Sequence, residues 1–187
     1  MGRQRLIIVC GVPGSGKSTF ALRVIDRWGA VSFASETFAE ELGAAARSAS
    51  GDLTKHAIVH AYSAMGAAVA AALATSELVL AVGSFRAEEQ RRRFRDIAKG
   101  AGANVTTIRI VCPAGTAAER VRSRMAHGER GPTERAIQGI DAELSRASDI
   151  DAVLTNDTSI EYFHRRADTM VEFLVRGSGH DPVIQSG

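Results

Sequence analysis

Short apolar runs alternate with longer segments of helical periodicity along the chain. Residues Leu6 to Cys10 form a continuous apolar run, which is typical of a parallel strand buried on both faces. The segment from Lys17 to Trp28 repeats apolar side chains at helical spacing and predicts a helix. The same reasoning predicts further strands over residues 31–34, 78–82, 105–111 and 152–155 and further helices over residues 36–42, 54–74, 87–99, 114–126, 133–148 and 159–175.

The order of these elements predicts the fold class. Strand and helix alternate repeatedly, which indicates an α/β domain whose parallel sheet is connected by right-handed helical crossovers. The length of 187 residues is about that of one domain. We therefore predict a single domain over residues 1–176, followed by a flexible tail over residues 177–187.

Composition and charge exclude several other classes of protein. Hydrophobic residues make up 45% of the chain and charged residues 24%, which excludes disordered and collagen-like chains. The net charge of +2 is too small to indicate nonspecific attraction to nucleic acid or to a membrane. Residues 57–76 carry no charge, but they are rich in alanine, which favours a buried helix over a membrane span. The two cysteines, Cys10 and Cys112, favour a reducing cytoplasm, and nothing in the sequence indicates an obligate protein partner.

One motif points directly to a ligand. The segment GVPGSGKS fits the pattern G-x-x-x-x-G-K-[ST], and it lies between a predicted strand and a predicted helix, as a phosphate-binding loop requires. Its glycines let backbone N–H groups point at phosphate oxygens, and the helix N-terminus adds its dipole. We expect Lys17 to reach the β- and γ-phosphates of ATP and the Ser18 hydroxyl to ligate Mg²⁺. The residues predicted to bind nucleotide here are Gly11, Pro13, Gly14, Ser15, Gly16, Lys17, Ser18 and Thr19.

Several segments, taken in order, resemble one family. They are the loop 11–19, the strand end 83–85 with the segment 88–94 after it, the arginine-bearing helix 120–124 and the turn 155–158. Together they resemble the small P-loop kinases, in particular the 5′-hydroxyl polynucleotide kinase domain, zeta toxins and chloramphenicol phosphotransferase. The resemblance implies a three-layer P-loop NTPase fold with a five-stranded parallel sheet of order 2-3-1-4-5 and a short helical lid. It also implies transfer of the γ-phosphate of ATP to a hydroxyl of a small molecule or of a nucleic-acid 5′ end.

Kinases of this group carry an acid after the second strand as general base, usually in an Asp-x-x-Arg pattern. Here Glu36 takes the place of the acid and Ala39 that of the arginine. In a parallel sheet the strand ends line the ligand crevice, so Glu36 is expected to face the same crevice as Lys17. The alternative is an ordinary acidic residue in the first turn of a helix, where Ser35 is a candidate N-cap. Asp52 is the second candidate for the base.

The end of the third strand departs from the family pattern. The family has an aspartate for the Mg²⁺ shell there, followed by a small hydroxyl residue, whereas this chain has Val82 and keeps Ser84. Either Mg²⁺ is held mainly by Ser18, phosphates and water, or catalysis is impaired. The second possibility defines an alternative function, a nucleotide-binding P-loop ATPase or degenerate kinase with weak or no transfer.

The predicted helix 114–126 carries two arginines on one face. Arg120 and Arg124 are spaced i, i+4, Arg122 turns away, and a glycine-containing interruption that includes Arg130 follows. Such a segment is typical of a lid that brings guanidinium groups to the transferring phosphoryl group, so both residues are candidate nucleotide ligands and Arg124 a candidate catalytic residue. The alternative is a solvated helix. The resemblance also places Asn156 among the nucleotide-binding residues, and the turn around it lacks the lysine of a guanine-binding motif.

The remaining charged candidates favour structural roles. Arg92, Arg95 and Lys99 are expected on an outward helix face, and Arg91 on the inward face, where a structural salt bridge is favoured over the cleft. His56 and His60 have two-ligand spacing, but no third ligand is evident, so they do not predict a metal site.

Overall fold

The protein is described by a computed structural model over residues 4–48, 52–127 and 131–176. The predicted flexible tail at 177–187 and Arg130 lie outside these residues. The strands are β1 (Arg5–Cys10), β2 (Val31–Ala34), β3 (Leu78–Val82), β4 (Asn104–Val111) and β5 (Ala152–Thr155). The helices are α1 (Lys17–Trp28), α2 (Ser35–Glu40), the 3-10 helix η1 (Gly43–Ala46), α3 (Lys55–Leu73), α4 (Glu88–Gly100), α5 (Ala114–Ala126), α6 (Glu134–Leu144) and α7 (Ile160–Arg176).

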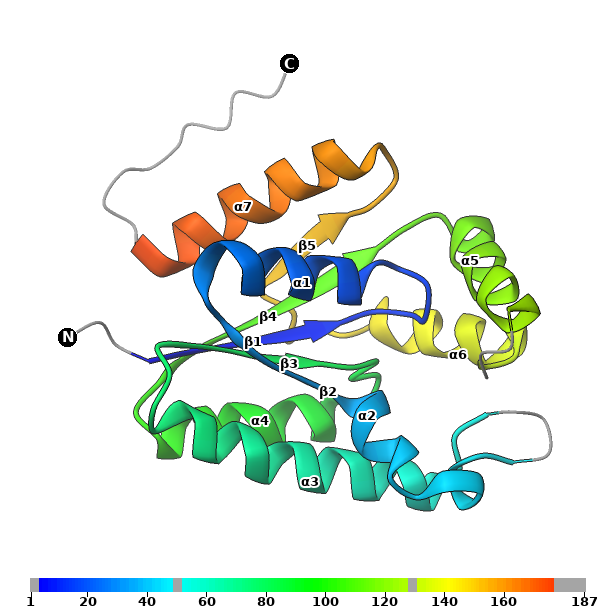
Figure 1. Ribbon diagram of the computed structural model, residues 1–187, viewed down its shortest axis with the longest axis horizontal. Helices are drawn as coiled ribbons and strands as arrows, with labels where there is room; N and C mark the ends of the chain where they lie inside the picture. Colours follow the sequence, from blue (N-terminus) through cyan, green and yellow to red (C-terminus); the bar gives the residue numbers. More distant parts are fainter. Residues whose placement is uncertain (1–3, 49–51, 128–130, 177–187) are drawn as a thin grey trace.

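The strands form a parallel five-stranded sheet in the order β2-β3-β1-β4-β5, which confirms the predicted topology. Figure 1 shows α1 and α7 on one face of the sheet and α3, α4 and α6 toward the other. Because all strands run the same way, their carboxyl ends meet at one edge, where the loop before α1, the start of α2 and α5 also lie. This edge is where a ligand crevice is expected in an open α/β sheet.

The central strand divides the core into two halves. Successive side chains of a strand point to opposite faces, so Leu6 and Ile8 of β1 pack with α3 and α4, whereas Ile7 and Val9 pack with α1 and α7. All of these side chains have no exposed surface. The continuous apolar run in the sequence therefore reflects burial on both faces.

Helix α3 is the one helix in the described parts of the chain that is long and apolar enough to cross a membrane. Its inward face packs against β2, β3 and α4. The residues it buries are Ala57, Ala61, Tyr62, Met65, Gly66, Val69 and Leu73. Thr54 caps its start by accepting a hydrogen bond from the Ala57 N–H at 3.1 Å. These contacts agree with the predicted buried helix.

Two predictions about local structure are wrong. Ser35 does not cap α2: it is the first helical residue, and Ala34 holds the N-cap position. The Ser35 hydroxyl is instead used inside the fold, where it hydrogen-bonds the Tyr62 side chain. Arg95 does not belong to a purely solvated face, because its guanidinium donates to Thr107 Oγ1 at 2.8 Å and pairs with Asp151.

Arg91 is a structural residue, as its inward position indicated. Its side chain is 2% exposed and pairs with Asp149 at 2.6 Å. The same guanidinium donates to the carbonyl oxygens of Phe85 and Arg86 at 2.6 and 3.1 Å. Arg91 therefore holds the segment that follows β3 in a fixed position next to the α6–β5 connection.

Candidate functional site

A cavity of about 700 Å³ opens at the carboxyl ends of the strands. Segments that are far apart in sequence line it, among them the loop before α1, the start of α2, the end of β3 and the inner face of α5. Of the predicted nucleotide ligands, those that line this cavity are Pro13, Gly14, Gly16, Lys17, Ser18, Thr19, Arg120, Arg124 and Asn156. Gly11 and Ser15 are buried behind them in the loop.

The phosphate-binding loop is held from behind by Asn156. The Asn156 side chain is buried, and its Nδ2 donates to the Ser15 carbonyl oxygen at 2.9 Å. Gly16 passes so close that a Cβ there would lie 2.2 Å from this Nδ2, and its φ of 106° favours glycine. Asn156 therefore positions the loop backbone in addition to lining the cavity, a role that its place in the sequence did not indicate.

Lys17 is folded back onto its own loop. Its Nζ donates to the Val12 carbonyl oxygen at 2.9 Å. Burial lowers the pKa of Lys17 from 10.5 to about 8, and the Glu36 carboxylate opposes this shift. Phosphate oxygens in the cavity would favour the charged ammonium in the same way. The charges of Glu36 and Arg124 both act on Lys17, so the three predicted catalytic residues share one electrostatic environment.

The predicted Mg²⁺ ligand, the Ser18 hydroxyl, lies in this cavity. The Ser18 hydroxyl is exposed at the start of α1 and lines the cavity, whereas Val82 at the end of β3 has no ligating atom. No group of three or more His, Cys, Asp or Glu side chains that could hold a metal occurs among the described residues. This donor set fits a magnesium ion that is held mainly by nucleotide phosphates and water.

Three hydroxyl groups meet at the end of β3, where the family pattern has an acid. The Tyr62 hydroxyl accepts the Phe85 N–H at 2.8 Å and lies 3.3 Å from Ser84 Oγ. A Cβ at Gly83 would be 2.8 Å from both the Tyr62 and the Ser35 oxygens, so a side chain there would displace these hydroxyl groups. Burial raises the pKa of Tyr62, which keeps this cluster uncharged.

Helix α5 packs its arginine-bearing face toward the phosphate-binding loop. Arg120 donates to the Gly14 carbonyl oxygen at 3.2 Å, and Arg124 lines the cavity one turn further along the helix. Arg122 is exposed and does not line the cavity. The geometry thus brings the two arginines of the predicted lid to the nucleotide site and leaves the third outside it.

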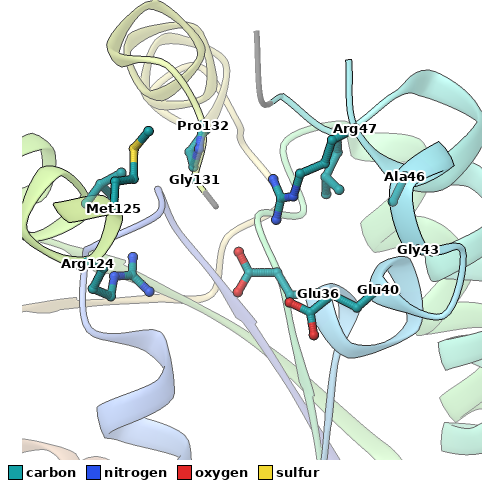
Figure 2. A pocket seen from close by; sticks show the side chains of 11 residues that line it. Glu36, Glu40, Gly43, Ala46, Arg47, Arg124, Met125, Gly131 and Pro132 are labelled. Carbon is teal, nitrogen blue, oxygen red and sulfur yellow. The ribbon is translucent and has the colours of Figure 1, made fainter. Parts of the chain in front are cut away.

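A second cavity, of about 420 Å³, adjoins the first beside Glu36. Figure 2 shows the Glu36 carboxylate and the Arg124 guanidinium pointing toward one another across it, with the guanidinium of Arg47 above and Glu40 next to Glu36. Glu36 and Glu40 are one turn apart on α2, so they share a face of that helix. The structure therefore places the predicted base where the two cavities meet.

Asp52, the second candidate for the base, is engaged in a structural contact. Its carboxylate accepts the Thr133 N–H at 2.9 Å and lies 3.3 Å from the Thr133 hydroxyl. Thr133 caps α6 by accepting the Ala136 N–H at 3.2 Å. Asp52 thus ties the segment before α3 to the start of α6, across the cavity from Lys17.

Sequence reasoning missed three charged residues of the site. Glu40 could have been found from its i, i+4 spacing to Glu36, but Arg47 and Arg86 lie in irregular segments without a motif. Arg86 lines the larger cavity and forms two hydrogen bonds to Glu143, at 2.7 and 2.6 Å. Arg86 is thus paired, but the other charged residues that line the larger cavity are still mostly cationic: Lys17, Arg47, Arg120 and Arg124 against Glu36 and Asp52. Such a lining suits a polyphosphate.

The histidine and cysteine candidates supply no chemistry to the site. His60 lies 3.8 Å from Glu41, and neither it nor His56 lines the cavities. Burial raises the pKa of the Cys10 thiol to about 11 and also raises that of Cys112, so both favour the unreactive thiol.

A family model described as an AAA domain matches residues 6–147. The match begins in β1 and ends after α6, so it includes the phosphate-binding loop, Glu36 and Arg124. The chain belongs to this AAA domain family. No curated protein matches the sequence of this chain.

Solved kinase structures share the fold of this AAA domain. The APS kinase CysC of Mycobacterium tuberculosis, in complex with AMPPNP and APS, is 20% identical with a TM-score of 0.66 over 93% of this chain and 99% of that one. A gluconokinase from Sinorhizobium meliloti is 18% identical with a TM-score of 0.65 over 94% and 96% of the two chains. Shikimate kinase from Acinetobacter baumannii, in complex with shikimate, is 15% identical with a TM-score of 0.63 over 95% and 96%. At these identities the likeness shows the three-layer P-loop fold.

Proposed function

We propose that this AAA domain is an ATP-dependent phosphotransferase that moves the γ-phosphate to a hydroxyl group. The observation that carries the proposal is the pair of adjoining cavities, one lined by the phosphate-binding loop and the other by Glu36 and Glu40. Glu36 and Arg124 line both, which is where a transferred group would pass from one ligand to the other. The fold shared with solved kinases supports the same function.

Glu36, Lys17 and Arg124 each have a separate role in the proposed reaction. The acceptor hydroxyl oxygen forms a bond to the γ-phosphorus while the bond from that phosphorus to the β,γ-bridging oxygen breaks, and ADP leaves. Glu36 accepts the hydroxyl proton and returns it to solvent. Lys17 neutralises charge on the β- and γ-phosphates, and Arg124 stabilises the charge on the phosphoryl group during transfer.

Magnesium would be held by the Ser18 hydroxyl together with nucleotide oxygens and water. When bound, it would draw charge from the β- and γ-phosphates and orient them. Val82 contributes nothing to this site, and the neighbouring hydroxyls of Ser35, Tyr62 and Ser84 offer hydrogen-bonding groups in place of the usual acid.

The acceptor in this proposal is either a small molecule or a nucleic-acid 5′ end. The resemblance to polynucleotide kinases, zeta toxins and chloramphenicol phosphotransferase supports both. The solved kinases named above are described as acting on small molecules, such as shikimate.

The decisive experiment is transfer of label from γ-labelled ATP to a panel of acceptors. The panel contains nucleosides, 5′-hydroxyl oligonucleotides, nucleotide sugars, simple sugars and amino-sugar alcohols. We expect one class to be labelled by the wild type and not by Lys17→Ala, which removes the cation at the phosphates. Absence of label on every acceptor, with ATP bound, would contradict the proposal.

A second candidate function is nucleotide binding with weak or no transfer. Two observations favour it: Val82 stands where the family has a metal-binding acid, and Ala39, in the position of the family arginine, is fully buried. The experiment above separates the two candidates, because a degenerate kinase binds ATP without labelling an acceptor.

A further inference from the structure

The smaller cavity is distinct from the nucleotide loop. None of its lining residues belongs to the phosphate-binding loop, and it joins the larger cavity through residues that line both, which are Glu36, Arg47, Leu53, Arg124 and Pro132. A molecule in the smaller cavity would therefore meet the γ-phosphate at Glu36 and Arg124. If the proposed transfer takes place, this cavity is the acceptor site.

The charges in the smaller cavity balance. Its charged lining residues are Glu36 and Glu40 on α2, Arg47 after η1 and Arg124 on α5. An anionic acceptor would meet two carboxylates, and a cationic one would meet two guanidinium groups. Neutral hydroxyl groups are not repelled by either kind of side chain, because they donate hydrogen bonds to carboxylates and accept them from guanidinium groups. Figure 2 shows Arg47 facing the two carboxylates across a space that such groups would occupy.

The rest of the lining is aliphatic. Leu53, Val121, Met125 and Pro132 form the apolar wall, and no aromatic residue lines this cavity in the parts of the chain that the structure describes. Aliphatic side chains pack against the C–H faces of a saturated ring or chain. Single-stranded nucleic acid is usually held by aromatic side chains on which its bases stack, together with cations along its backbone. The described lining of the cavity supplies two cations, Arg47 and Arg124, but no aromatic side chain on which a base could stack.

Two parts of the cavity wall are joined to one another, and the volume of the cavity is that of a small-molecule site. The hydrogen bonds from Thr133 to Asp52 join the two segments that contribute Pro132 and Leu53 to the wall. A volume of about 420 Å³ lies in the range of small-molecule sites.

We propose that the phosphate acceptor of this protein is a small, neutral polyhydroxyl compound of about monosaccharide size. This inference rests on the proposed phosphotransfer and decides between its two acceptor classes. Glu40 and Arg47 are the specificity-determining residues: Glu40 accepts hydrogen bonds from hydroxyl groups that do not react, and Arg47 donates to them. Glu36 then faces the hydroxyl that receives the phosphate.

The first test measures binding without transfer. The wild-type protein is saturated with AMPPNP and Mg²⁺ and titrated with neutral monosaccharides and linear polyols, a sugar acid, an amino sugar and a 5′-hydroxyl oligonucleotide. We expect at least one neutral polyhydroxyl compound to bind more tightly than its acidic and aminated counterparts and than the oligonucleotide. Absence of binding by every neutral compound at about 10 mM overturns the inference, as does preferential binding of any other class.

The second test removes the negative charge of Glu40 and the positive charge of Arg47, one at a time. Glu40→Gln and Arg47→Gln are each expected to weaken the neutral ligand by roughly tenfold, the effect of about one hydrogen bond to a charged group. AMPPNP affinity is expected to be unchanged in Glu40→Gln, because Glu40 lines only the smaller cavity. If the natural acceptor were anionic, Glu40→Gln would strengthen its binding; if it were cationic, Arg47→Gln would. The exposed Glu41, which lines neither cavity, provides the matched control Glu41→Gln.

These outcomes also separate this inference from the proposed function. Labelling of the oligonucleotide from ATP would overturn the acceptor class and leave the phosphotransferase intact. Binding of a neutral polyol to the AMPPNP complex, with no transfer from ATP, would leave the ligand class intact and contradict the phosphotransferase.

Discussion

The two sides of the site are built in different ways. On the nucleotide side, the phosphate-binding loop is fixed by its backbone, by the buried Asn156 and by the close approach of Gly16. On the acceptor side, the exposed side chains of Glu36 and Glu40 come from α2 and that of Arg124 comes from α5. The nucleotide side is thus preorganised for a ligand of constant shape, whereas the acceptor side can change with few substitutions. ATP affinity and acceptor choice are therefore expected to respond to different residues.

Replacement of Lys17 by alanine is expected to have the largest effect. It removes the ammonium group that we propose faces the β- and γ-phosphates, so we expect calorimetry to detect no productive binding of Mg-ATP. In the wild type, ATP at a hundredfold excess over the Kd should stabilise the fold by about 2.7 kcal/mol, and the variant should lack this gain. Lys99→Ala, on the exposed surface of α4, is the control. If the wild type did not bind ATP, the assignment of the phosphate-binding loop as a nucleotide site would be wrong.

Glu36→Gln should separate the two sides most clearly. The amide keeps the shape of the side chain and removes the proton acceptor, so transfer is expected to fall by roughly 10² to 10⁴ with ATP affinity nearly unchanged. Steady-state transfer assays and calorimetry measure the two quantities, with Glu41→Gln as the matched control. Transfer at the wild-type rate would contradict the assignment of the base, and Asp52→Asn would then be tested despite its contact with Thr133.

Arg124→Ala tests the junction between the sides. If Arg124 stabilises the phosphoryl group mainly during transfer, its loss lowers kcat by roughly 10² to 10³ and raises the KM for ATP much less. Arg122→Ala is the control, because Arg122 lies on the same helix but outside both cavities. Kinetics equal to those of the wild type would show that Arg124 is an ordinary solvated residue of α5.

The smallest expected effect is a proton taken up when ATP binds. Since the pKa of Lys17 in the ligand-free protein is about 8, and phosphates favour the charged form, binding should take up about half a proton at pH 8 and about a tenth at pH 7. Calorimetry in two buffers of different ionisation enthalpy measures this uptake. Equal uptake at both pH values would exclude Lys17 as its source.

The same shift has a defined sign for stability. Below pH 8, Lys17 is charged in both the folded and the unfolded chain, and its burial costs free energy. Between about pH 8 and 10.5, the folded chain releases the proton while the unfolded chain still holds it. The contribution of Lys17 to the free energy of unfolding therefore rises with pH across this window.

The strands and the phosphate-binding loop could be predicted from the sequence because each depends on local signals, whereas the strand order followed from the family resemblance. Apolar runs marked β1 and β3, and the bounds of α1 were predicted to the residue. The errors arose where a tertiary contact outweighed the position that local sequence favoured for a side chain. Ser35 had the side chain of an N-cap, but its hydroxyl is used by Tyr62, and Arg95 had the spacing of a surface residue but reaches Thr107.

The acceptor side could be predicted only in part. Glu36 follows a strand, so the edge rule for parallel sheets brought it to the crevice. Arg47 follows the short helix η1 and Arg86 follows β3, and neither has a motif or a periodicity that ties it to the site. Their positions depend on how α2, α3 and α6 pack together, which a single sequence does not encode in any short pattern.

The hydrogen bond from Asn156 to Ser15 has a consequence for biosynthesis. Its two residues are 141 positions apart, so the loop near the start of the chain gains its support only after almost the entire domain has been translated. A nascent chain that ends at residue 147, where the family match ends, would lack both Asn156 and the Phe163 ring that packs in the core beside α1. Such long-range closure is slow to form. Competence to bind nucleotide is therefore expected to arise late, as one of the last steps in maturation of the chain.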